Sequence, residues 1–540
     1  MNHEVLTNEL DEKTKSLIEK VEQMEKELNS KNSEIKNLQN EVEFLKSIIL
    51  NKNKKIFGVS SEQVAADQLS FFNEAEKCSD SKIEEPTLEE VIYKRTNKKD
   101  YIGKKDNLAN LERVIIEHKL QGDDLYCKTC GSELLLIGVK SKKEILKYVP
   151  AKLTVEEHIF YSYACKPCEI EIGESNIVSS EAPKTIFYNS MASNELVAHT
   201  LILKYQHAMP LYRQETYFDM MGATLSRQTL CNWTMVAADA LVPVYTQMKK
   251  ELLSRNYINA DETTLKVIND NGKDSKSKKY MWLYMSNTDS KPVILYDYQS
   301  TRSSSCPKNF LGDFKGFLQT DGYSGYNSVI NATRLYCLAH IRRYFYQIVE
   351  PLDEEAKKNS RAVIGFNYCE QIYKLEKELR ESYSSDEKYY DIRFKIRAEK
   401  LAPIIDNFMD YLEREIKLAL PRSPLGKALE YARKHLPGVK NVLLNGSLEV
   451  DNNFAERSIK PFVIGRKNFL FSNTAKGATA SACIYSIVET AKANNLVVER
   501  YLVYLFDNLS RIDIKDLESL DNLMPWSHKI PEIMKIKDMK

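Results

Sequence analysis

The N-terminal part of the chain places apolar residues on a repeating a/d register, with Glu and Lys filling much of the remainder and no Pro or Gly across the seam. Such a narrow stripe is typical of a coiled coil, in which apolar side chains pack into holes on a partner helix. Thr14 and Lys31 occupy an a and a d position and weaken the seam. We predict self-association through residues 1–57, and a helix packed on its own protein is the alternative. The apolar positions are Leu10, Leu17, Val21, Met24, Leu28, Ile35, Leu38, Val42, Leu45 and Ile49.

Residues 58–106 combine an acid-rich stretch with a basic one and little apolar content, which predicts a charge-segregated linker. Residues 107–182 contain two Cys-x-x-Cys pairs separated by a strand-like stretch. Four thiolates are the ligand set of a structural tetrahedral Zn²⁺, whereas the alternative, a redox pair, needs only one Cys-x-x-Cys. The sequence therefore predicts a zinc ribbon with the ligands Cys127, Cys130, Cys165 and Cys168.

Residues 190–248 have helical spacing, broken by the turn Gly222-Ala223-Thr224-Leu225. Ser226 follows the turn and is placed to cap a second helix. A helix, a short turn that contains Gly and a second, capped helix together form the helix-turn-helix pattern. Any helical hairpin has the same pattern, which is the alternative interpretation. Polar residues near the start of the second helix are candidates for DNA contact: Arg227, Gln228 and Asn232.

From Tyr257 the pattern changes to short apolar runs that predict strands. Asp261 lies on the first run, and Asp321 directly follows the fourth. A helix carrying Arg342 and Arg343, which we take as candidate DNA contacts, begins after the fifth. The expected strands are 257–267, 280–285, 293–298, 317–320 and 334–338.

The pattern turns helical again after the fifth strand. Residues 346–440 are rich in helix formers and predict a helical insertion into a strand-containing domain made of residues 250–345 and 441–500. Residues 501–540 are expected to form a helical tail. The fold class expected from these patterns is multidomain α+β.

Three acids, Asp261, Asp321 and Glu456, stand in contexts suited to a divalent cation. Mg²⁺ prefers hard oxygen ligands, and two such ions about 3.5–4 Å apart activate an attacking hydroxyl and stabilise the leaving oxygen in phosphoryl transfer. Each aspartate alone is more often a turn former or a cap, and Asp451 competes with Glu456 for the third position. Nearby bases are candidates for phosphate contact, with a solvated face as the alternative: Arg457, Lys460, Arg466 and Lys467.

Composition narrows the function classes only slightly. The 540 residues exceed one typical core, and 77 basic against 76 acidic residues leave any DNA binding to local patches. We find neither an 18-residue apolar run nor an N-terminal apolar signal region. Six cysteines outside the Cys-x-x-Cys pairs are scattered, which suits a reduced compartment. We therefore expect a cytoplasmic protein with no membrane partner.

An ordered series of motifs over nearly the whole chain resembles the insertion-sequence-66 type of bacterial DDE transposases. Lys460 and Gly477-Ala478 depart mildly from the family pattern and remove none of the acids. Besides the paired Cys-x-x-Cys motifs, the series comprises Ser60-Ser61-Glu62, Leu211-Tyr212-Arg213-Gln214, Leu230-Cys231-Asn232-Trp233, Asp261-Glu262-Thr263, Asp321-Gly322-Tyr323, His340-Ile341-Arg342-Arg343, Asn452-Asn453-Phe454-Ala455-Glu456-Arg457 and Gly465-Arg466-Lys467-Asn468.

The resemblance implies a ribonuclease H-like catalytic domain in which Asp261, Asp321 and Glu456 hold two Mg²⁺ or Mn²⁺ ions. It further implies a nucleoid-associated transposase that binds element ends, hydrolyses a phosphodiester to expose a 3′-hydroxyl and joins it to target DNA. Homo-oligomers and accessory proteins encoded by the same element are the expected partners. Two rival interpretations remain: a non-catalytic DNA-binding protein that keeps a nuclease-like scaffold, and a metal-dependent nuclease without strand transfer.

Overall fold

The computed structural model describes residues 20–21, 23–28, 31, 115, 132, 151–165, 176–181, 183–187, 190–270, 273–274, 278–286, 291–384 and 386–536. Most of the predicted coiled coil, the predicted linker and most of the predicted zinc ribbon lie outside them. Cys127, Cys130 and Cys168 are outside as well, and Cys165 is described only by its backbone, in β1 (Ser162–Cys165), which pairs antiparallel with β2 (Asn176–Ser179).

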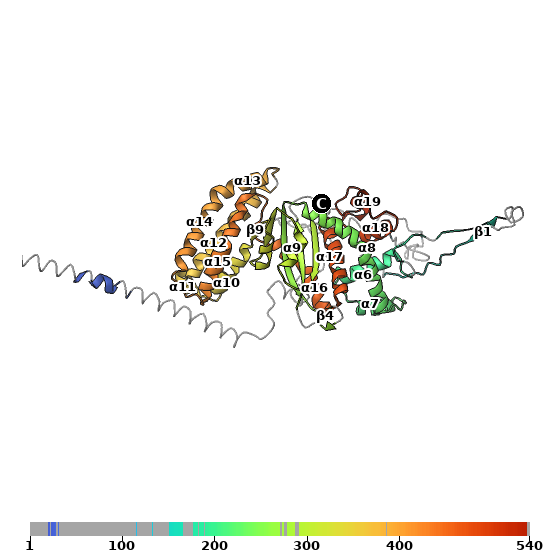
Figure 1. Ribbon diagram of the computed structural model, residues 1–540, viewed down its shortest axis with the longest axis horizontal. Coiled ribbons are helices and arrows are strands. Elements are labelled where there is room, and N and C mark those ends of the chain that lie inside the picture. The colour runs from blue at the N-terminus through green and yellow to red at the C-terminus, as the bar shows by residue number, and fades with distance from the viewer. Residues whose placement is uncertain are drawn as a thin grey trace, which may run out of the picture. The chain divides into compact units, whose positions relative to one another are not determined.

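The central element of the described chain is a five-stranded mixed sheet with the order β7-β6-β3-β8-β9 (Figure 1). The first three strands in this order are antiparallel, and the last two add in parallel beside β3. Buried aromatic side chains of β6, including Trp282 and Tyr284, fill its centre. The strands are β3 (Tyr257–Leu265), β6 (Lys279–Ser286), β7 (Val293–Gln299), β8 (Phe317–Thr320) and β9 (Thr333–Tyr336).

All five strands were expected from the sequence, with small differences at their ends. The first expected strand is divided, because β3 ends at Leu265 and β4 (Val267–Asp270) leaves the main sheet. β4 pairs in parallel with β10 (Ser472–Thr474) and antiparallel with β5 (Lys273–Asp274). The fifth strand ends at Tyr336, and Leu338 already begins a helix.

Helix α17 (Ala475–Ala493) covers the β7 end of the sheet and packs on α8 (Arg227–Leu253). Its small side chains allow a close approach, so that Ser486 accepts a hydrogen bond from the Tyr296 N–H at 2.8 Å. Thr490 likewise accepts from the Ile294 N–H at 3.0 Å. These hydroxyls satisfy backbone groups of an edge strand that would otherwise lack partners.

The expected helix-turn-helix pattern is present as local structure. α7 (Leu211–Met220) ends in a turn at which Gly222 adopts φ +88°, a conformation that suits a residue without Cβ. The Ser226 hydroxyl then accepts a hydrogen bond from the Thr229 N–H at 3.1 Å and caps α8. Near its other end α8 is fixed to the sheet, because the Tyr245 hydroxyl donates to the Tyr296 carbonyl at 3.0 Å.

A helical bundle of residues 338–440 separates β9 from the second half of the sheet domain, where the sequence predicted a helical insertion over residues 346–440. Its buried core includes Phe345, Ile405 and Leu429, and α15 also packs on β9 (Figure 1). Among the described residues no helix combines the length and apolar character that crossing a bilayer requires. The bundle comprises α10 (Leu338–Val349), α11 (Glu354–Asn359), α12 (Arg361–Tyr383), α13 (Tyr389–Ile396), the π-helical η3 (Arg397–Leu401), α14 (Ala402–Glu415) and α15 (Pro424–Lys440).

The chain returns from the bundle into α16 (Asn453–Phe469), which packs on β3. After α17 follow α18 (Val498–Leu509), α19 (Leu517–Asn522) and the short 3-10 helix η5 (Glu532–Met534). α18 packs against α6 (Asn194–Tyr205). Segments far apart in the sequence therefore build one sheet domain, with the bundle inserted between β9 and α16.

Candidate active site

Asp261 lies within β3, and Asp321 directly follows β8, the parallel strand beside it. The β3–β8 register pairs Asn259 with Gln319, and extending it by two further residues brings Asp261 beside Asp321. Because the strands run parallel, both residues lie near the same end of β8. Neighbouring strands are only about 4.8 Å apart, so the two side chains are close to each other. Strand pairing therefore brings together two acids that are 60 residues apart in the sequence.

Glu456 reaches the same place because the start of α16 is fixed to β3. The Asn452 side-chain amide donates to the Ala260 carbonyl at 2.8 Å and accepts from the Asn259 amide at 3.0 Å. Asn452 occupies the N-cap position of α16 without a side-chain capping hydrogen bond, and its carbonyl accepts from the Glu456 N–H at 3.1 Å. Residues four apart share a helix face. Glu456 therefore lies on the face of α16 that meets β3 beside Asp261.

The electrostatics of Asp261 fit a cation. Burial raises the pKa of Asp261 well above its usual range, and the charges of Glu262, Asp321 and Glu456 raise this pKa further. One backbone N–H, that of Glu262, donates to the carboxylate at 2.8 Å. Like charges gathered in a partly buried place are disfavoured without a counter-charge. The donor set, oxygen ligands only, suits a hard divalent ion.

His340, which the sequence analysis did not include among the site residues, joins this group from the first turn of α10. Its Nδ1 lies 3.9 Å from Glu456 Oε1. Both atoms are buried, and neither has a hydrogen-bond partner in the described structure. Burial and Arg343 lower the pKa of His340, although Glu456 and Asp321 act in the opposite direction.

Cys337 is the third member of a cluster whose ligand atoms lie within 4.8 Å of one another. Burial raises the pKa of its thiol to about 12. The sulfur accepts a hydrogen bond from the Asn452 N–H at 3.2 Å. A neutral thiol already engaged in this way fills space between α10 and α16, which leaves Glu456 and His340 as the members of the cluster with donor atoms unengaged by any described residue.

Glu262, next to Asp261, is held by other groups. Arg302 donates to its Oε1, through Nε at 2.8 Å and also through Nη2, and the Tyr326 hydroxyl donates to Oε2 at 2.6 Å. Because both oxygens are engaged, Glu262 anchors the loop around Arg302 rather than offering a free ligand. The sequence contains no periodic signal for this pairing.

The helical insertion reaches the site through α15. A Cβ at Gly322 would lie 2.7 Å from the Tyr431 hydroxyl and 2.9 Å from His435 Nε2, so only glycine allows this approach next to Asp321. Burial lowers the pKa of His435 to about 4, with Lys434 and Arg334 contributing. The insertion is therefore one wall of the site, which the sequence pattern did not predict.

Asp451, the competitor for the third position, is occupied in local contacts. Its carboxylate accepts hydrogen bonds from the Asn453 N–H at 3.1 Å and from the Asn453 amide at 2.7 Å. A further hydrogen bond comes from Tyr373. Asn452, not Asp451, is the N-cap residue. These contacts favour a structural role for Asp451 and leave Glu456 as the third acid of the group.

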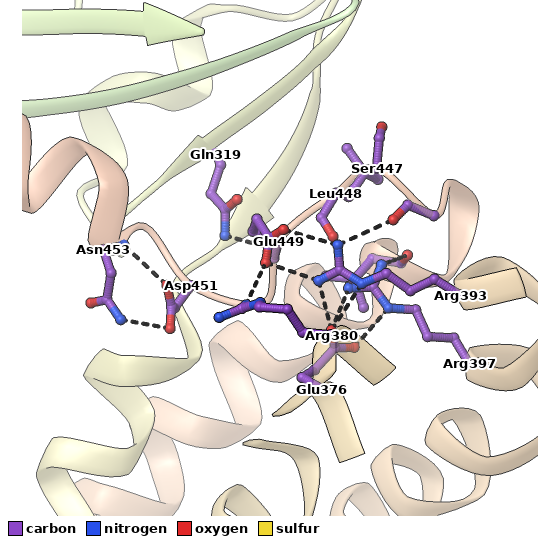
Figure 2. A network of polar contacts seen from close by, with 12 residues as sticks. Gln319, Glu376, Arg380, Arg393, Arg397, Ser447, Leu448, Glu449, Asp451 and Asn453 are labelled. Carbon is purple, nitrogen blue, oxygen red and sulfur yellow. Dashed lines mark hydrogen bonds and ion pairs between the residues drawn. The ribbon is translucent and has the colours of Figure 1, made fainter. Parts of the chain in front are cut away.

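A buried charge cluster in the insertion holds residues 442–449, which we call the return segment (Figure 2). Glu376, Arg393 and Arg397 are at most 2% exposed. Arg393 and Arg397 both bind Glu376, with the shortest contacts at 2.6 and 2.7 Å. Burial alone would raise the pKa of Glu376, but the two arginines together lower it.

The same arginines donate to the return segment. Arg397 binds the carbonyls of Val442 and Leu448 at 3.1 and 2.8 Å, and Arg393 binds both carboxylate oxygens of Glu449 at 2.9 Å. The Glu449 carbonyl in turn accepts from Gln319 of β8 at 2.9 Å (Figure 2). Since the return segment leads into α16, the cluster contributes to the placement of Glu456.

The residues predicted to contact DNA fall into two groups. Arg466 is half-buried and donates to the Thr263 and Thr264 hydroxyls of β3 at 3.2 Å, and Arg342 pairs with Glu370 of α12. These two guanidinium groups have protein partners. The second group is defined by exposed side chains, some of which also contact protein groups: Arg227, Gln228, Asn232, Arg343, Arg457, Lys460 and Lys467.

Comparison with family models gives four matches along the chain. A model described as "Transposase IS66 family" matches residues 189–480, which contain the sheet, the three acids and the insertion. "Zinc-finger binding domain of transposase IS66" matches residues 124–169, a range that includes all four Cys-x-x-Cys cysteines. "IS66 C-terminal element" matches residues 486–526, and "Transposase C of IS166 homeodomain" matches residues 45–116.

Three curated relatives from Sinorhizobium fredii also match. One uncharacterized protein (y4jD) is 30% identical over 438 residues, covering 78% of this chain and 80% of its own. A second uncharacterized protein (y4qI) is 27% identical, covering 78% of this chain and 76% of its own. No solved structure matches.

Proposed function

Because the chain belongs to the IS66 transposase family, we propose that it is a transposase that cleaves DNA at element ends and joins them to target DNA. The observation that carries this proposal is the meeting of Asp261, Asp321 and Glu456 from two strands and one helix. Membership in the family confirms the resemblance seen in the sequence, and it implies DNA as partner and a divalent metal as cofactor.

We further propose that the sheet domain is ribonuclease H-like. Three antiparallel strands, a crossover through α9 (Ser305–Leu311) and two parallel strands bring Asp261, in the middle of β3, close to Asp321, just after β8. A helix after the insertion supplies the third acid. This arrangement supports the assignment of Asp261, Asp321 and Glu456 as the ligands of two Mg²⁺ ions, or of Mn²⁺.

In the proposed mechanism, different residues of the site have different roles. Asp261, Asp321 and Glu456 would hold the cations, which would supply activation of the attacking hydroxyl and stabilisation of the leaving oxygen. Arg302 and Tyr326 bind the Glu262 carboxylate, so that Glu262 is not a free ligand beside the three acids. Exposed Arg343 and Arg457 are placed to hold the phosphate backbone.

We assign the recognition of DNA sequence to residues in the first turns of α8. Arg227, Gln228 and Asn232 are exposed there, and Gln228 donates to Asn232 at 2.9 Å, which orients both side chains. Since the far end of α8 is bonded to β7 and packs on α17, a DNA segment held by the first turns is fixed relative to the sheet. Accessory proteins from the same element remain part of the proposal.

Cleavage of labelled DNA that carries the inverted repeats flanking the reading frame tests this function. We expect a nick that exposes a 3′-hydroxyl at the element end in Mg²⁺ or Mn²⁺, and none in EDTA. The acids lie in the described sheet domain, so the metal dependence follows from the proposed ligands. Nicking at equal rate in EDTA would contradict the proposal.

We also propose that Cys127, Cys130, Cys165 and Cys168 bind one structural Zn²⁺. Cys127→Ser or Cys168→Ser is expected to release the metal and to unfold the ribbon locally, because structural zinc binding is linked to folding. Zinc content per chain, measured by mass spectrometry of the metals, checks this. Cys231→Ser in α8 is the matched control and is expected to keep its zinc. Purified wild-type protein without zinc would refute the assignment.

Self-association through the N-terminal seam is a further proposal. Val21, Met24 and Leu28 lie in a helical stretch and are 53%, 69% and 62% exposed in the single chain. Leu28→Glu is expected to lower the assembly mass, because a charge at an a position must be buried on pairing. Sedimentation measures it, with Lys26→Glu on the outer face as the control. An unchanged mass for Leu28→Glu would show that another surface carries the association.

A further inference from the structure

His340 and Glu456 face each other but do not form a hydrogen bond. Nδ1 of His340 and Oε1 of Glu456 are buried, lack hydrogen-bond partners in the described structure, and stand 3.9 Å from each other. A buried polar atom without a hydrogen-bond partner is destabilising, so such atoms need an explanation. Here two of them face each other at the edge of the acidic group.

A second histidine–glutamate pair in the same chain gives the comparison. His199 of α6 and Glu499 of α18 approach to 2.8 Å, a direct hydrogen bond. His340 and Glu456 have the same chemistry and comparable exposure, at 24% and 31% of their side chains against 32% and 44%. The wider spacing therefore comes from the packing of α10 and α16, which positions the two donor atoms without closing the pair.

The spacing fits one shared ion. Ligand atoms about 2.0–2.2 Å from a divalent cation are separated by up to about 4.3 Å when they lie across it, and 3.9 Å is within that range. Both helix starts are fixed: the Leu338 N–H donates to the Val450 carbonyl at 3.0 Å, and the Asn452 N–H donates to Cys337 Sγ at 3.2 Å. The two donors are thus preorganised.

We propose that His340 is a metal ligand that shares one of the active-site cations with Glu456, and that this imidazole shifts the site from Mg²⁺ towards Mn²⁺. Mg²⁺ requires hard oxygen ligands, whereas imidazole nitrogen suits transition-metal ions. The inference rests on the proposed function, because it takes the three acids as the other ligands. It assigns to the His340-Ile341-Arg342-Arg343 motif a role distinct from DNA contact.

Mn²⁺ bound to the full-length protein is the probe. Electron spin echo envelope modulation is expected to detect ¹⁴N coupled to Mn²⁺ in the wild type, and His340→Gln is expected to lose it. His199→Gln is the matched control and keeps the coupling. Mn²⁺ affinity is expected to fall about tenfold or more in His340→Gln, with a smaller fall for Mg²⁺.

A third variant separates coordination from packing. In His340→Asp an oxygen replaces Nδ1 at nearly the same distance from the backbone, so we expect recovered Mn²⁺ and Mg²⁺ binding without the ¹⁴N coupling. Coupling that persists in His340→Gln, or is absent in the wild type, overturns the inference. If in that case Asp321→Asn and Glu456→Gln still weaken Mn²⁺ binding, the proposed function stands. Unchanged Mn²⁺ binding in those two acid variants would instead contradict the proposed metal site itself.

Discussion

Asp321→Asn is expected to reduce strand cleavage by at least about 100-fold while DNA affinity at constant salt is retained. The substitution keeps the size of the side chain and removes the charge that a cation requires, and even changes outside the ligand shell of metal sites cost about 10–100-fold. Exposed residues such as Arg227 and Lys467 lie on other elements and are unaffected. Cleavage rates and binding isotherms of the same preparations measure the two properties separately.

Asp261→Asn and Glu456→Gln are expected to behave alike, and any double variant should lose little more than a single one, because residues that act as one unit are strongly non-additive. Asp451→Asn is the matched control: its carboxylate serves Asn453 and Tyr373, so a modest loss is expected. Loss of cleavage in Asp451→Asn together with normal cleavage in Glu456→Gln would reverse the assignment of the third acid.

The second large effect is on stability, at the buried charge cluster of the insertion. Arg397→Met leaves Glu376 buried beside one arginine instead of two, and removing one partner of a buried ionic group costs about 3–5 kcal/mol. It also removes the hydrogen bonds to Val442 and Leu448 in the return segment. Urea unfolding followed by circular dichroism is expected to show a lower midpoint for the variant.

Lys357→Met in α11 of the same bundle is the comparison. Lys357 pairs with the 88% exposed Glu354 at 2.7 Å, and such surface pairs contribute about 0–1 kcal/mol. Its midpoint should stay close to that of the wild type. Equal midpoints for Arg397→Met and wild type would mean that the cluster does not hold the return segment.

Much of the sheet domain was predictable because its signals are local. Asp321 follows the short strand-like run Phe317–Thr320 that forms β8, and Ser226 follows a glycine turn and caps α8 as expected. A strand needs only its own alternation, and a cap needs only neighbours three residues away. The adjacency of Asp261 and Asp321 required one further assumption, that their strands pair in parallel.

The features of the site and the core that the sequence did not predict depend on contacts between distant segments. His340 has no periodic signal in the sequence, and it meets Glu456 only because α10 and α16 begin side by side. Arg393 and Arg397 have the composition of a solvated helix face, yet both are fully buried because Glu376 compensates their charge. Charged residues are rarely buried without such a partner, and no local pattern reveals the partner.

The central claim, that the three acids serve strand transfer, is tested most directly by a joining assay with an element end that is already cleaved and carries a free 3′-hydroxyl. The account predicts joined product with target DNA in Mg²⁺ or Mn²⁺ for the wild type and for Asp451→Asn, and none for Asp321→Asn. Nicking of uncut ends without joining would indicate a nuclease. Bound DNA with neither reaction from wild-type protein loaded with Mn²⁺, together with any required accessory proteins, would contradict the transposase mechanism.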